Sequence, residues 1–471
     1  IEGNYTTGAT PGNGTFTAKK LTINSGTLTV VTGTNLTVVN ELINNAGSTA
    51  VIIENNANLI QTNDIANTGA ITVKRNSNPL KRLDYTMWSS PTGTTQTLSN
   101  FSPLTSSGRF YEYDSATDLY SVVPPSTTFS QAKGFLIRMP NENNTFGYNT
   151  GDTPIIFTGI FTGIPNNGTI RISGTPGQFL ATGNPYPSAI NADLFINSNI
   201  DSGGTGTLYF WRKTNNINQR TNPSTSYATY TKAGAVVSGS GSSNDGYIPT
   251  VNMAVGQGFI TAVPSSGQLV FTNSMRSSSN TLQVLKLKSL EKSRVWINLL
   301  SGENLINQMM IAYIDKASKD VDVYDGKYID DNPTALSSEI NKEEYVIQAR
   351  GLPFDASDVI NLNFKTTVEG EYTITKDHVD GLFATGQDVY LVDKSIGKVT
   401  NLQTDSYKFT TLVGTYNDRF QLQFKTNSAL SFEKALVNEN TILVNKQNGI
   451  LNINAGTIMI KNVKIFDMMG R

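Results

Sequence analysis

The sequence predicts an all-β chain of several domains, and three observations support that prediction. Apolar residues recur at alternate positions in many short runs, which is the two-residue period of a strand with one buried face. Gly and Asn separate these runs, and both residues tolerate the positive φ that tight turns require. Hardly any segment has the period of a helix. Because 471 residues are too many for one hydrophobic core, we expect roughly two to four domains.

Composition favours an exported β protein and excludes several other classes. Only 15% of the residues are charged, the formal net charge is −1 and the isoelectric point is about 6.0, so no basic surface for nucleic acid or an anionic membrane is expected. Cysteine is absent, which excludes thiol chemistry and Cys-ligated metals without excluding secretion. No apolar run reaches the roughly eighteen residues of a transmembrane helix. No signal-peptide pattern follows Ile1, so we expect that such a peptide was removed or that the chain is a segment of a longer one.

Residues 1–78 are predicted to form a short N-terminal β-solenoid. Runs such as Leu21-Thr22-Ile23, Leu28-Thr29-Val30 and Leu36-Thr37-Val38 are separated by Gly and Asn turns. One such rung is too small to bury its own apolar face, so successive rungs have to stack on one another. The spacing of the runs is irregular, which indicates an imperfect solenoid. Half of a plain β-sandwich is the alternative.

Residues 79–277 are predicted to be a duplicated β-sandwich-like region, with copies at about 79–150 and 151–277. In each copy an aromatic strand enters an X-Pro turn, a second aromatic strand follows, and a Gly-Phe strand ends the unit. The three segments are 85–91, 109–114 and 131–137 in the first copy, and 179–187, 207–212 and 255–260 in the second. The shared order of the segments indicates duplication more strongly than any single match.

Trp88, Tyr209 and Trp211 are candidate glycan-stacking residues, because flat aromatic rings stack on sugar rings. Aromatic residues in alternating strands more often fill the core of a β protein. We therefore expect core packing for these three residues and for Tyr111, with glycan stacking as the alternative. The segment Gly183-Asn184-Pro185-Tyr186-Pro187 is expected to be a rigid turn with a structural role.

Residues 278–426 are predicted to form a C-terminal antiparallel β-sandwich. About nine runs alternate cleanly there, with turn residues between them, which is the pattern of such a sandwich. The runs are 284–287, 294–299, 309–314, 345–349, 360–364, 372–375, 389–392, 407–410 and 420–424. A polar linker at 427–440 and a partial small β module at 441–471 are expected to follow.

The last segment, 441–471, is expected to form three successive antiparallel strands. Apolar residues alternate in three short runs, 442–444, 450–453 and 458–465, with Asn-Gly and Ala-Gly turns between them. A three-strand module with an open edge exposes backbone groups that invite pairing with another chain. We therefore expect that a partner covers this edge, or that the natural chain continues beyond Arg471.

The end of this segment also resembles a known export signal, the Val-x-Ile-Tyr-Asp-x-x-Gly-Arg-like motif. The matching residues are Val463, Ile465, Phe466, Asp467, Gly470 and Arg471. This motif belongs to the C-terminal sorting domain of proteins exported by the type IX secretion system of Bacteroidetes. The match is to a type A-like domain truncated at its C-terminal end, because two or three further strands of the family are missing.

The resemblance extends into the preceding domain, where 349–355, 393–394 and 414–420 are similar to the β-sandwich that often precedes sorting domains in flavobacterial surface proteins. It implies passage through the periplasm to the outer cell surface or the medium. It also implies that the C-terminal module is recognised by the type IX translocon or its shuttle protein. An ordinary last hairpin of a β domain is the alternative.

Few residues could carry chemistry. His378 is the only histidine, so a normal zinc shell is excluded, and no Gly-x-Ser-x-Gly elbow accompanies it; we expect a solvated residue in a turn. Carboxylates gather in one acidic loop, and Ca²⁺ prefers hard oxygen ligands of this kind. The candidate calcium ligands are Asp320, Asp322, Asp325, Asp330 and Asp331. Their spacing does not match an EF-hand, and a solvated acidic loop is the alternative.

These observations together predict a non-catalytic exported protein of the cell surface, structural or adhesive, with no catalytic residues. Calcium is the one candidate cofactor, and a surface glycan is a candidate partner beside the secretion machinery. Nucleotide partners are not expected, because no Gly-rich phosphate loop stands between a strand and a helix. A carbohydrate-binding surface protein is the first alternative. A polysaccharide hydrolase, which would need two carboxylates facing each other, is the second.

Overall fold

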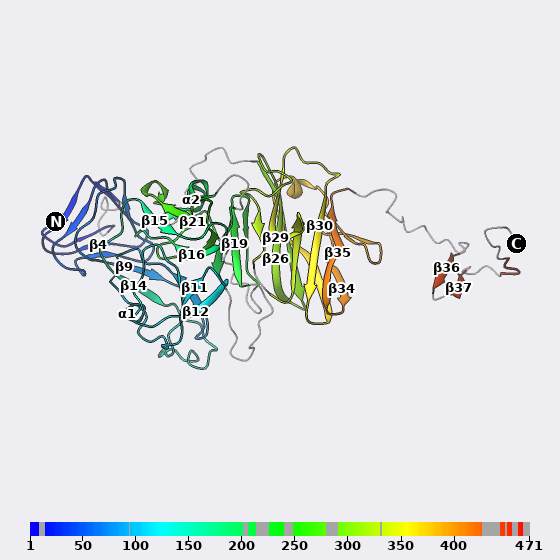
Figure 1. The fold of residues 1–471 in the computed structure, drawn as a ribbon, viewed down its shortest axis with the longest axis horizontal. Coiled ribbons are helices and arrows are strands. Elements are labelled where there is room, and N and C mark those ends of the chain that lie inside the picture. The colour runs from blue at the N-terminus through cyan, green and yellow to red at the C-terminus, as the bar shows by residue number, and fades with distance from the viewer. Residues whose placement is uncertain are drawn as a thin grey trace.

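The computed structural model describes residues 1–8, 15–93, 95–200, 206–212, 226–239, 248–278, 291–329, 332–425, 443–447, 450–454 and 460–464. Strands dominate, and the helical elements are short: α1 (Leu98–Phe101), α2 (Ala192–Asn199), and the 3-10 turns η1 (Asn273–Met275) and η2 (Gly381–Thr385). The predicted all-β class is confirmed. None of the helices in these ranges is long and apolar enough to cross a bilayer. Figure 1 shows an elongated body that runs from a coil of stacked short strands at the N-terminus, called the coil below, to a large C-terminal sheet.

The N-terminal strands form a coil with three sides, in which every neighbouring pair is parallel. The strands are β1 (Tyr5–Thr6), β2 (Phe16–Ala18), β3 (Leu21–Ile23), β4 (Leu28–Val30), β5 (Asn35–Val38), β6 (Leu42–Asn44), β7 (Val51–Ile53), β8 (Asn58–Gln61) and β9 (Ile71–Asn76). Strands β1, β4, β7 and β9 stack on one side, β2, β5 and β8 on a second, and β3 and β6 on the third. This is the pairing of stacked rungs, and it differs from the antiparallel pairing of half a sandwich.

Alternating apolar residues fill the inside of the coil. Leu28, Val30, Val51 and Ile53 are fully buried, whereas the residues between them are partly exposed. At the turn before β4, Gly26 has a φ of +74°, and a Cβ there would lie 2.2 Å from the carbonyl oxygen of Gly3. Only glycine therefore allows these two turns to stack at this distance.

Two antiparallel sheets follow, and they share one strand order. Sheet one has the order β10-β13-β11-β12 and sheet two the order β16-β22-β18-β19-β20. Their strands are β10 (Tyr85–Trp88), β11 (Phe110–Asp114), β12 (Leu119–Val122), β13 (Phe135–Arg138), β16 (Phe179–Gly183), β18 (Leu208–Trp211), β19 (Tyr227–Thr231), β20 (Gly234–Val236) and β22 (Gly258–Ala262). Each sheet is flanked by one antiparallel pair, β9 with β14 (Thr158–Gly163) and β15 (Ile170–Ser173) with β23 (Gln268–Phe271). The short strands β17 (Ala189–Asn191), β21 (Asn252–Met253) and β24 (Arg276–Ser277) make a further small sheet.

The residue pairings of the two sheets also correspond. Across β10 and β13, Tyr85 pairs with Arg138 and Met87 with Leu136. At the same places of sheet two, Phe179 pairs with Ala262 and Ala181 with Ile260. One step further, the pair Tyr113 and Tyr120 corresponds to Trp211 and Tyr227. The shared strand order and register are those expected of a duplicated unit.

The inner faces of the two sheets pack against each other. One cluster contains Met87 and Leu136 from sheet one together with Ala181, Tyr209 and Ile260 from sheet two. On their outer faces the sheets carry separate cores. Trp88 and Phe135 belong to the core that continues into the coil, and Phe259 belongs to the core beneath α2. The arrangement is therefore layered, with a shared aromatic interface in its middle.

The turn at 183–187 joins sheet two to the coil. Asn184 and Tyr186 are fully buried in it. The backbone N–H of Leu59 in β8 donates to the carbonyl of Pro187 at 2.7 Å, and the N–H of Ala189 donates to the Oδ1 of Asn58 at 2.9 Å. These bonds satisfy backbone groups at the open end of the last rung, which is the structural role that the rigid Pro turn predicts.

The C-terminal strands form one continuous sheet, which differs from the predicted antiparallel sandwich. The strands are β25 (Lys292–Ser301), β26 (Asn304–Ile314), β27 (Gly326–Lys327), β28 (Ala335–Ile340), β29 (Glu343–Gly351), β30 (Val359–Thr366), β31 (Gly370–Val379), β32 (Tyr390–Asp393), β33 (Lys398–Asn401), β34 (Tyr407–Thr411) and β35 (Gly414–Gln423). The order is β33-β32-β35-β30-β28-β29-β26-β25-β31-β34, with β27 beside β29. The prediction of purely antiparallel pairing is wrong at β26 and β29, which run parallel. The predicted run 284–287 lies outside the described residues.

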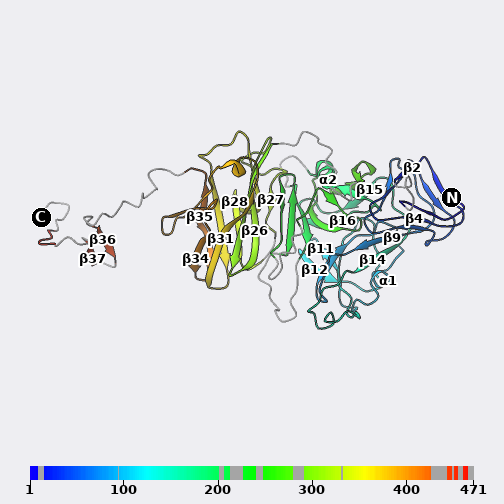
Figure 2. The same cartoon turned by 180° about the vertical axis from the view of Figure 1, so that it is seen from behind.

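This sheet curls around its own core and is joined to sheet two. Fully buried residues such as Leu299, Phe364 and Phe420 fill its interior. On the outside, the Trp296 indole N–H donates to the carbonyl of Ala235 in β20 at 2.7 Å. Figure 2 shows β26 and β27 on the side of the sheet that faces the N-terminal half of the body.

In the described part of the C-terminal segment the structure has one hairpin, against the three strands expected. β36 (Leu443–Gln447) pairs antiparallel with β37 (Ile450–Asn454). The expected third strand is absent from 460–464, which are exposed and have no strand pairing. Within the described ranges the hairpin pairs with no other strand, and Figure 1 shows it apart from the C-terminal sheet.

Candidate functional site

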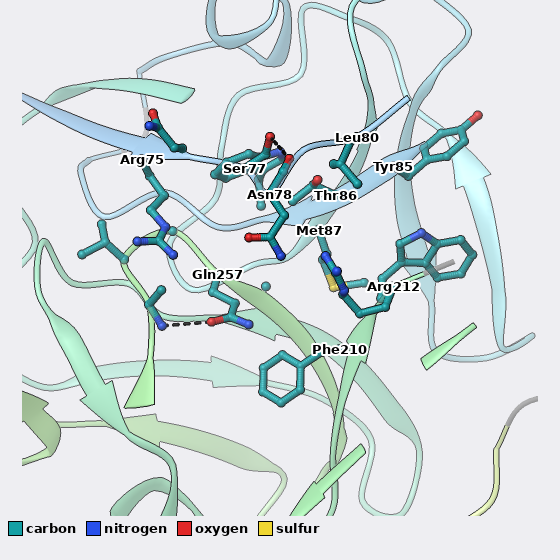
Figure 3. A pocket seen from close by; sticks show the side chains of 17 residues that line it. Arg75, Ser77, Asn78, Leu80, Tyr85, Thr86, Met87, Phe210, Arg212 and Gln257 are labelled. Carbon is teal, nitrogen blue, oxygen red and sulfur yellow. Dashed lines mark hydrogen bonds between the residues drawn. The ribbon is translucent and has the colours of Figure 1, made fainter. Parts of the chain in front are cut away.

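A groove lies where the outer edge of sheet one meets sheet two. Its walls are the end of β9 and the segment after it, the edge strand β10, the end of β18 and the turn before β22. It contains about 690 Å³ of empty volume, part of which is open to solvent. Figure 3 shows Arg75 and Gln257 toward one end of this groove and Tyr85 toward the other.

Aromatic residues from both sheets line the groove. Tyr85 and Trp88 come from β10, and Phe210 and Trp211 come from β18. Trp88 is only 4% exposed, and its ring makes edge contacts with Phe101 at 5.3 Å between ring centroids, so most of it belongs to the core. Trp211 is half-buried, and its buried indole N–H has no hydrogen-bond partner among the described residues.

Tyr209 does not line the groove. It is 1% exposed, belongs to the interface between the two sheets, and donates through its hydroxyl to the carbonyl of Lys327 at 2.7 Å. The structure therefore brings together two of the three candidate glycan-stacking residues, Trp88 and Trp211. Core packing, the interpretation favoured by the sequence, describes Trp88 and Tyr209, whereas Tyr111 is only half-buried.

The polar lining of the groove consists of cations and amides. Arg75 and Arg212 contribute the cations, and Asn78 and Gln257 contribute amides. The Gln257 Oε1 accepts a hydrogen bond from the N–H of Ala254 at 2.9 Å, which fixes its side chain in the turn before β22. No Asp or Glu is among the lining residues of the described chain. Aromatic surface with a few placed polar groups suits a neutral or anionic ligand and lacks the carboxylate pair of a glycoside hydrolase.

The acidic loop uses its described carboxylates to hold its own backbone. Asp322 accepts from the N–H groups of Ser318 at 2.8 Å and Tyr324 at 2.9 Å. Asp325 is fully buried and accepts from the N–H groups of Ala349 at 2.8 Å and Asp322 at 2.9 Å. Burial raises the pKa of Asp325 to about 7, against the lowering effect of these two hydrogen bonds.

Three of the five candidate calcium ligands, Asp320, Asp322 and Asp325, lie within the described residues. Asp330 and Asp331 lie outside the described residues, and Asp320 is exposed. Within the described part of the chain no three His, Cys, Asp or Glu residues gather as a metal site.

His378 lies in strand β31, and its expected place in a turn is wrong. Its ring stacks on Trp296 at 3.9 Å between centroids and 17° between planes. Its Nδ1 lies 2.6 Å from the Oδ2 of Asp377. The side chain is exposed on one side, so the solvated character that the sequence predicts is retained.

The residues of the export motif are mostly beyond the described ranges. Val463 is 51% exposed and lies in a segment without strand pairing. Ile465, Phe466, Asp467, Gly470 and Arg471 lie outside the described residues.

Sequence reasoning missed one further group of residues, Arg82, Arg109 and Arg138, which gather at one end of sheet one. A comparison of the two copies is the signal that could have found this group. At the positions of Arg109 and Arg138, sheet two carries Thr207 and Ala262, which are uncharged.

Comparison with known proteins gives one match. A family model described as Domain of unknown function (DUF8693) matches residues 4–424, which include the coil, both sheets and the C-terminal sheet. No curated protein and no solved structure matches the chain.

Proposed function

The chain belongs to the family described as Domain of unknown function (DUF8693), and from that premise we propose that it is a non-catalytic, exported protein of the cell surface or medium. Its β body acts as a structural or adhesive scaffold. Its C-terminal module, which resembles a type IX sorting domain, is the signal read by the secretion translocon or its shuttle protein.

One observation carries this proposal: the separateness of the hairpin β36–β37. Among the described residues it pairs with no strand of the body. The core of the C-terminal sheet is complete without it, because Phe420, Leu422 and Phe424 are at most 2% exposed. A segment that the body does not need for its stability is free to act as an address, and an unpaired strand edge offers backbone groups for recognition by strand addition.

The finer interpretation of the fold belongs to the same proposal. We interpret the N-terminal coil as a short β-solenoid and the two corresponding sheets as a duplicated, sandwich-like unit. The C-terminal sheet is then a single, nearly closed sheet that curls around its own core. Stacked short strands with few charged residues suit a spacer or adhesive scaffold.

Deletion of residues 440–471 tests the proposal in a bacterium that has a type IX system. We expect the deleted protein to accumulate, folded, in the periplasm, because the deletion removes the signal and leaves the body intact. A matched control deletes 240–247 instead, which leaves the C-terminal module in place. Export of the 440–471 deletion at the level of the full chain would overturn the proposal.

A carbohydrate-binding function is the second candidate, and the groove favours it. Trp211 and Tyr85 supply aromatic surface there, beside the nearly buried Trp88, and Arg75 and Gln257 supply hydrogen-bonding groups. This combination of aromatic faces and oriented polar groups suits a saccharide. An adhesive surface protein and a glycan-binding groove are compatible, since the groove would be the point of adhesion.

A further inference from the structure

Three arginines gather around Tyr85, at the end of sheet one where β10 and β11 begin and β13 ends. Arg138 pairs directly with Tyr85 across β10 and β13. The N–H of Arg138 donates to the carbonyl of Arg109 at 3.2 Å, so Arg109 is its neighbour on the other side. Arg82 approaches from the segment before β10, because its Nη1 and the Nη2 of Arg138 both donate to the Oδ1 of Asn141, at 3.4 Å and 3.1 Å.

The cluster is graded from buried to exposed. Arg138 is 8% exposed, Arg82 is half-buried and Arg109 is exposed. The Nε atoms of Arg82 and Arg138 are buried and have no hydrogen-bond partner in the described chain. Arg109 donates to the hydroxyl of Tyr111 at 3.1 Å. The cluster thus combines two buried, unused Nε donors with one exposed guanidinium group.

Three positive charges lie close together in this cluster. None of the three guanidinium groups forms an ion pair with a carboxylate in the described residues, and two of them share one neutral amide oxygen. Asp84, two residues after Arg82, is buried, and its Oδ2 accepts from the N–H of Lys81 at 2.8 Å. Burial, together with the positive charges of Arg109 and Arg82, lowers the pKa of Arg138. A buried guanidinium without a counter-ion is costly, so it calls for an anion.

The second sheet provides an internal control for this argument. Phe179 and Ala262 stand where sheet one has Tyr85 and Arg138. By the same register Thr207 stands where sheet one has Arg109, and Pro176 precedes Phe179 as Arg82 precedes Tyr85. The fold is therefore built without arginine at all three places in sheet two. Packing alone does not account for them in sheet one.

We propose that Arg82, Arg109 and Arg138 form a binding site for a tetrahedral oxyanion, either free sulfate or phosphate or the sulfate or phosphate ester of a larger ligand. Guanidinium groups offer paired N–H donors that match the oxygens of such anions. The two unpartnered Nε groups are the buried donors of the site, and Arg109 is its exposed cation. This site is independent of the export signal and distinct from the groove beside β10, although Tyr85 borders both.

Thermal unfolding of the full chain tests the proposal, in sodium sulfate, sodium phosphate and galactose 6-sulfate at constant ionic strength. Ligand binding raises the melting temperature, and the concentration that gives half of the rise reports affinity. We expect Arg109→Thr, the residue of sheet two, to require at least about tenfold more anion than the original chain. Arg171→Thr, an exposed arginine in β15, is the matched control and should respond as the original chain does, because it experiences only the general salt effect.

Arg138→Ala separates binding from a structural role. In chloride buffer without oxyanion this variant should be at least as stable as the original chain, because an unpaired buried charge is removed. In sulfate it should lose the specific rise in melting temperature. If Arg109→Thr weakens the binding of both anions, their half-saturating concentrations identify the kind of ligand. A lower concentration for galactose 6-sulfate than for sulfate would support a sulfated saccharide as the ligand. A lower concentration for sulfate would support a free anion. Equal anion responses in all variants, or an Arg138→Ala loss of stability that is the same with and without sulfate, would overturn the proposal.

Discussion

The hydroxyl oxygens of Tyr120 and Tyr227 lie 2.9 Å apart. The two tyrosines stand at corresponding places of the two sheets, opposite Tyr113 in sheet one and Trp211 in sheet two. Their hydrogen bond therefore joins equivalent residues and marks the approximate symmetry axis between the sheets. The ring of Trp211 contacts both tyrosines, at 5.6 Å and 5.4 Å between centroids. The backbone repeats this reciprocity, since Trp88 bridges to Gln257 and Lys133 bridges to Thr182.

Replacing either tyrosine of this pair with phenylalanine should weaken the interface. We expect Tyr120→Phe and Tyr227→Phe each to lower the free energy of unfolding by about 1 kcal/mol, because a hydrogen bond between half-buried groups is lost. The double variant should cost less than the sum, since both changes remove the same bond. Denaturant unfolding followed by tryptophan fluorescence measures this, with Tyr5→Phe in the coil as control. Strictly additive costs would show that the two hydroxyls do not act together.

The buried ion pair of Asp393 and Arg419 should be a main contributor to the stability of the C-terminal sheet. Asp393 is fully buried and accepts from Arg419 at 2.9 Å, Tyr407 at 2.7 Å and Ser395. Burial raises its pKa, but the hydrogen bonds from Arg419, Ser395 and Tyr407 outweigh that effect and the pKa is lowered.

Asp393→Asn should therefore destabilise the protein by about 3–5 kcal/mol, since it leaves Arg419 without its carboxylate. Asp418→Asn is the matched control, because Asp418 is fully exposed and its solvent-screened ion pair with Lys394 should contribute little to stability. Because the folded pKa of Asp393 is lowered, its contribution is present above the ordinary pKa of 3.8 and is lost as the pH falls through the folded value. Similar losses for both variants in denaturant unfolding would contradict this prediction.

Asp325 should make stability fall as the pH rises. Its folded pKa of about 7 lies above the ordinary value of 3.8, so between these values the folded chain keeps a proton that the unfolded chain releases. The free energy of unfolding then falls by up to about 1.4 kcal/mol per pH unit from this group. Asp325→Asn cannot titrate, so the stability advantage of the original chain over this variant should shrink between about pH 4 and pH 7. Asp320→Asn is the control, and a constant advantage across this range would disprove the prediction.

The groove should require Trp211 for saccharide binding. We expect Trp211→Ala to weaken retention on immobilised polysaccharides by about tenfold, the effect of losing one stacked ring, while the far-ultraviolet spectrum stays unchanged. Phe146→Ala is the matched control, because Phe146 is an exposed aromatic residue, at 97%, outside the groove. If both variants bind as the original chain does, or if no polysaccharide is retained by any of them, the glycan-binding candidate fails.

Local patterns predicted much of this fold. The Leu-Thr-Ile and Leu-Thr-Val runs of the coil could be predicted as strands, because the alternation of apolar residues is visible in the local sequence. The Gly and Asn turns between them could be predicted for the same reason. The order of aromatic and Gly-Phe segments anticipated two sheets with one strand order. Long alternating runs such as those around Ile297 and Phe364 became β25 and β30.

Features that depend on pairing between segments far apart in the sequence could not be predicted from local patterns. The parallel pair β26 and β29 comes from topology, and β28 was missed because Ser337 and Ser338 interrupt its apolar pattern although both are buried. The arginine cluster arises from the register between Tyr85 and Arg138, which one segment alone cannot reveal. The groove likewise needs β10 and β18 side by side, so Trp88 and Trp211 could be singled out but not joined.

The export signal is tested most directly by measuring the surface-exposed fraction of the protein in intact cells of a bacterium with a type IX system, by accessibility to added protease. Two chains are compared, the original and one that carries Val463→Asp together with Ile465→Asp, which leaves the body from the coil to Phe424 untouched. Our account predicts that the variant is folded but protected from the protease, because it stays in the periplasm. Equal surface exposure of the two chains would contradict it.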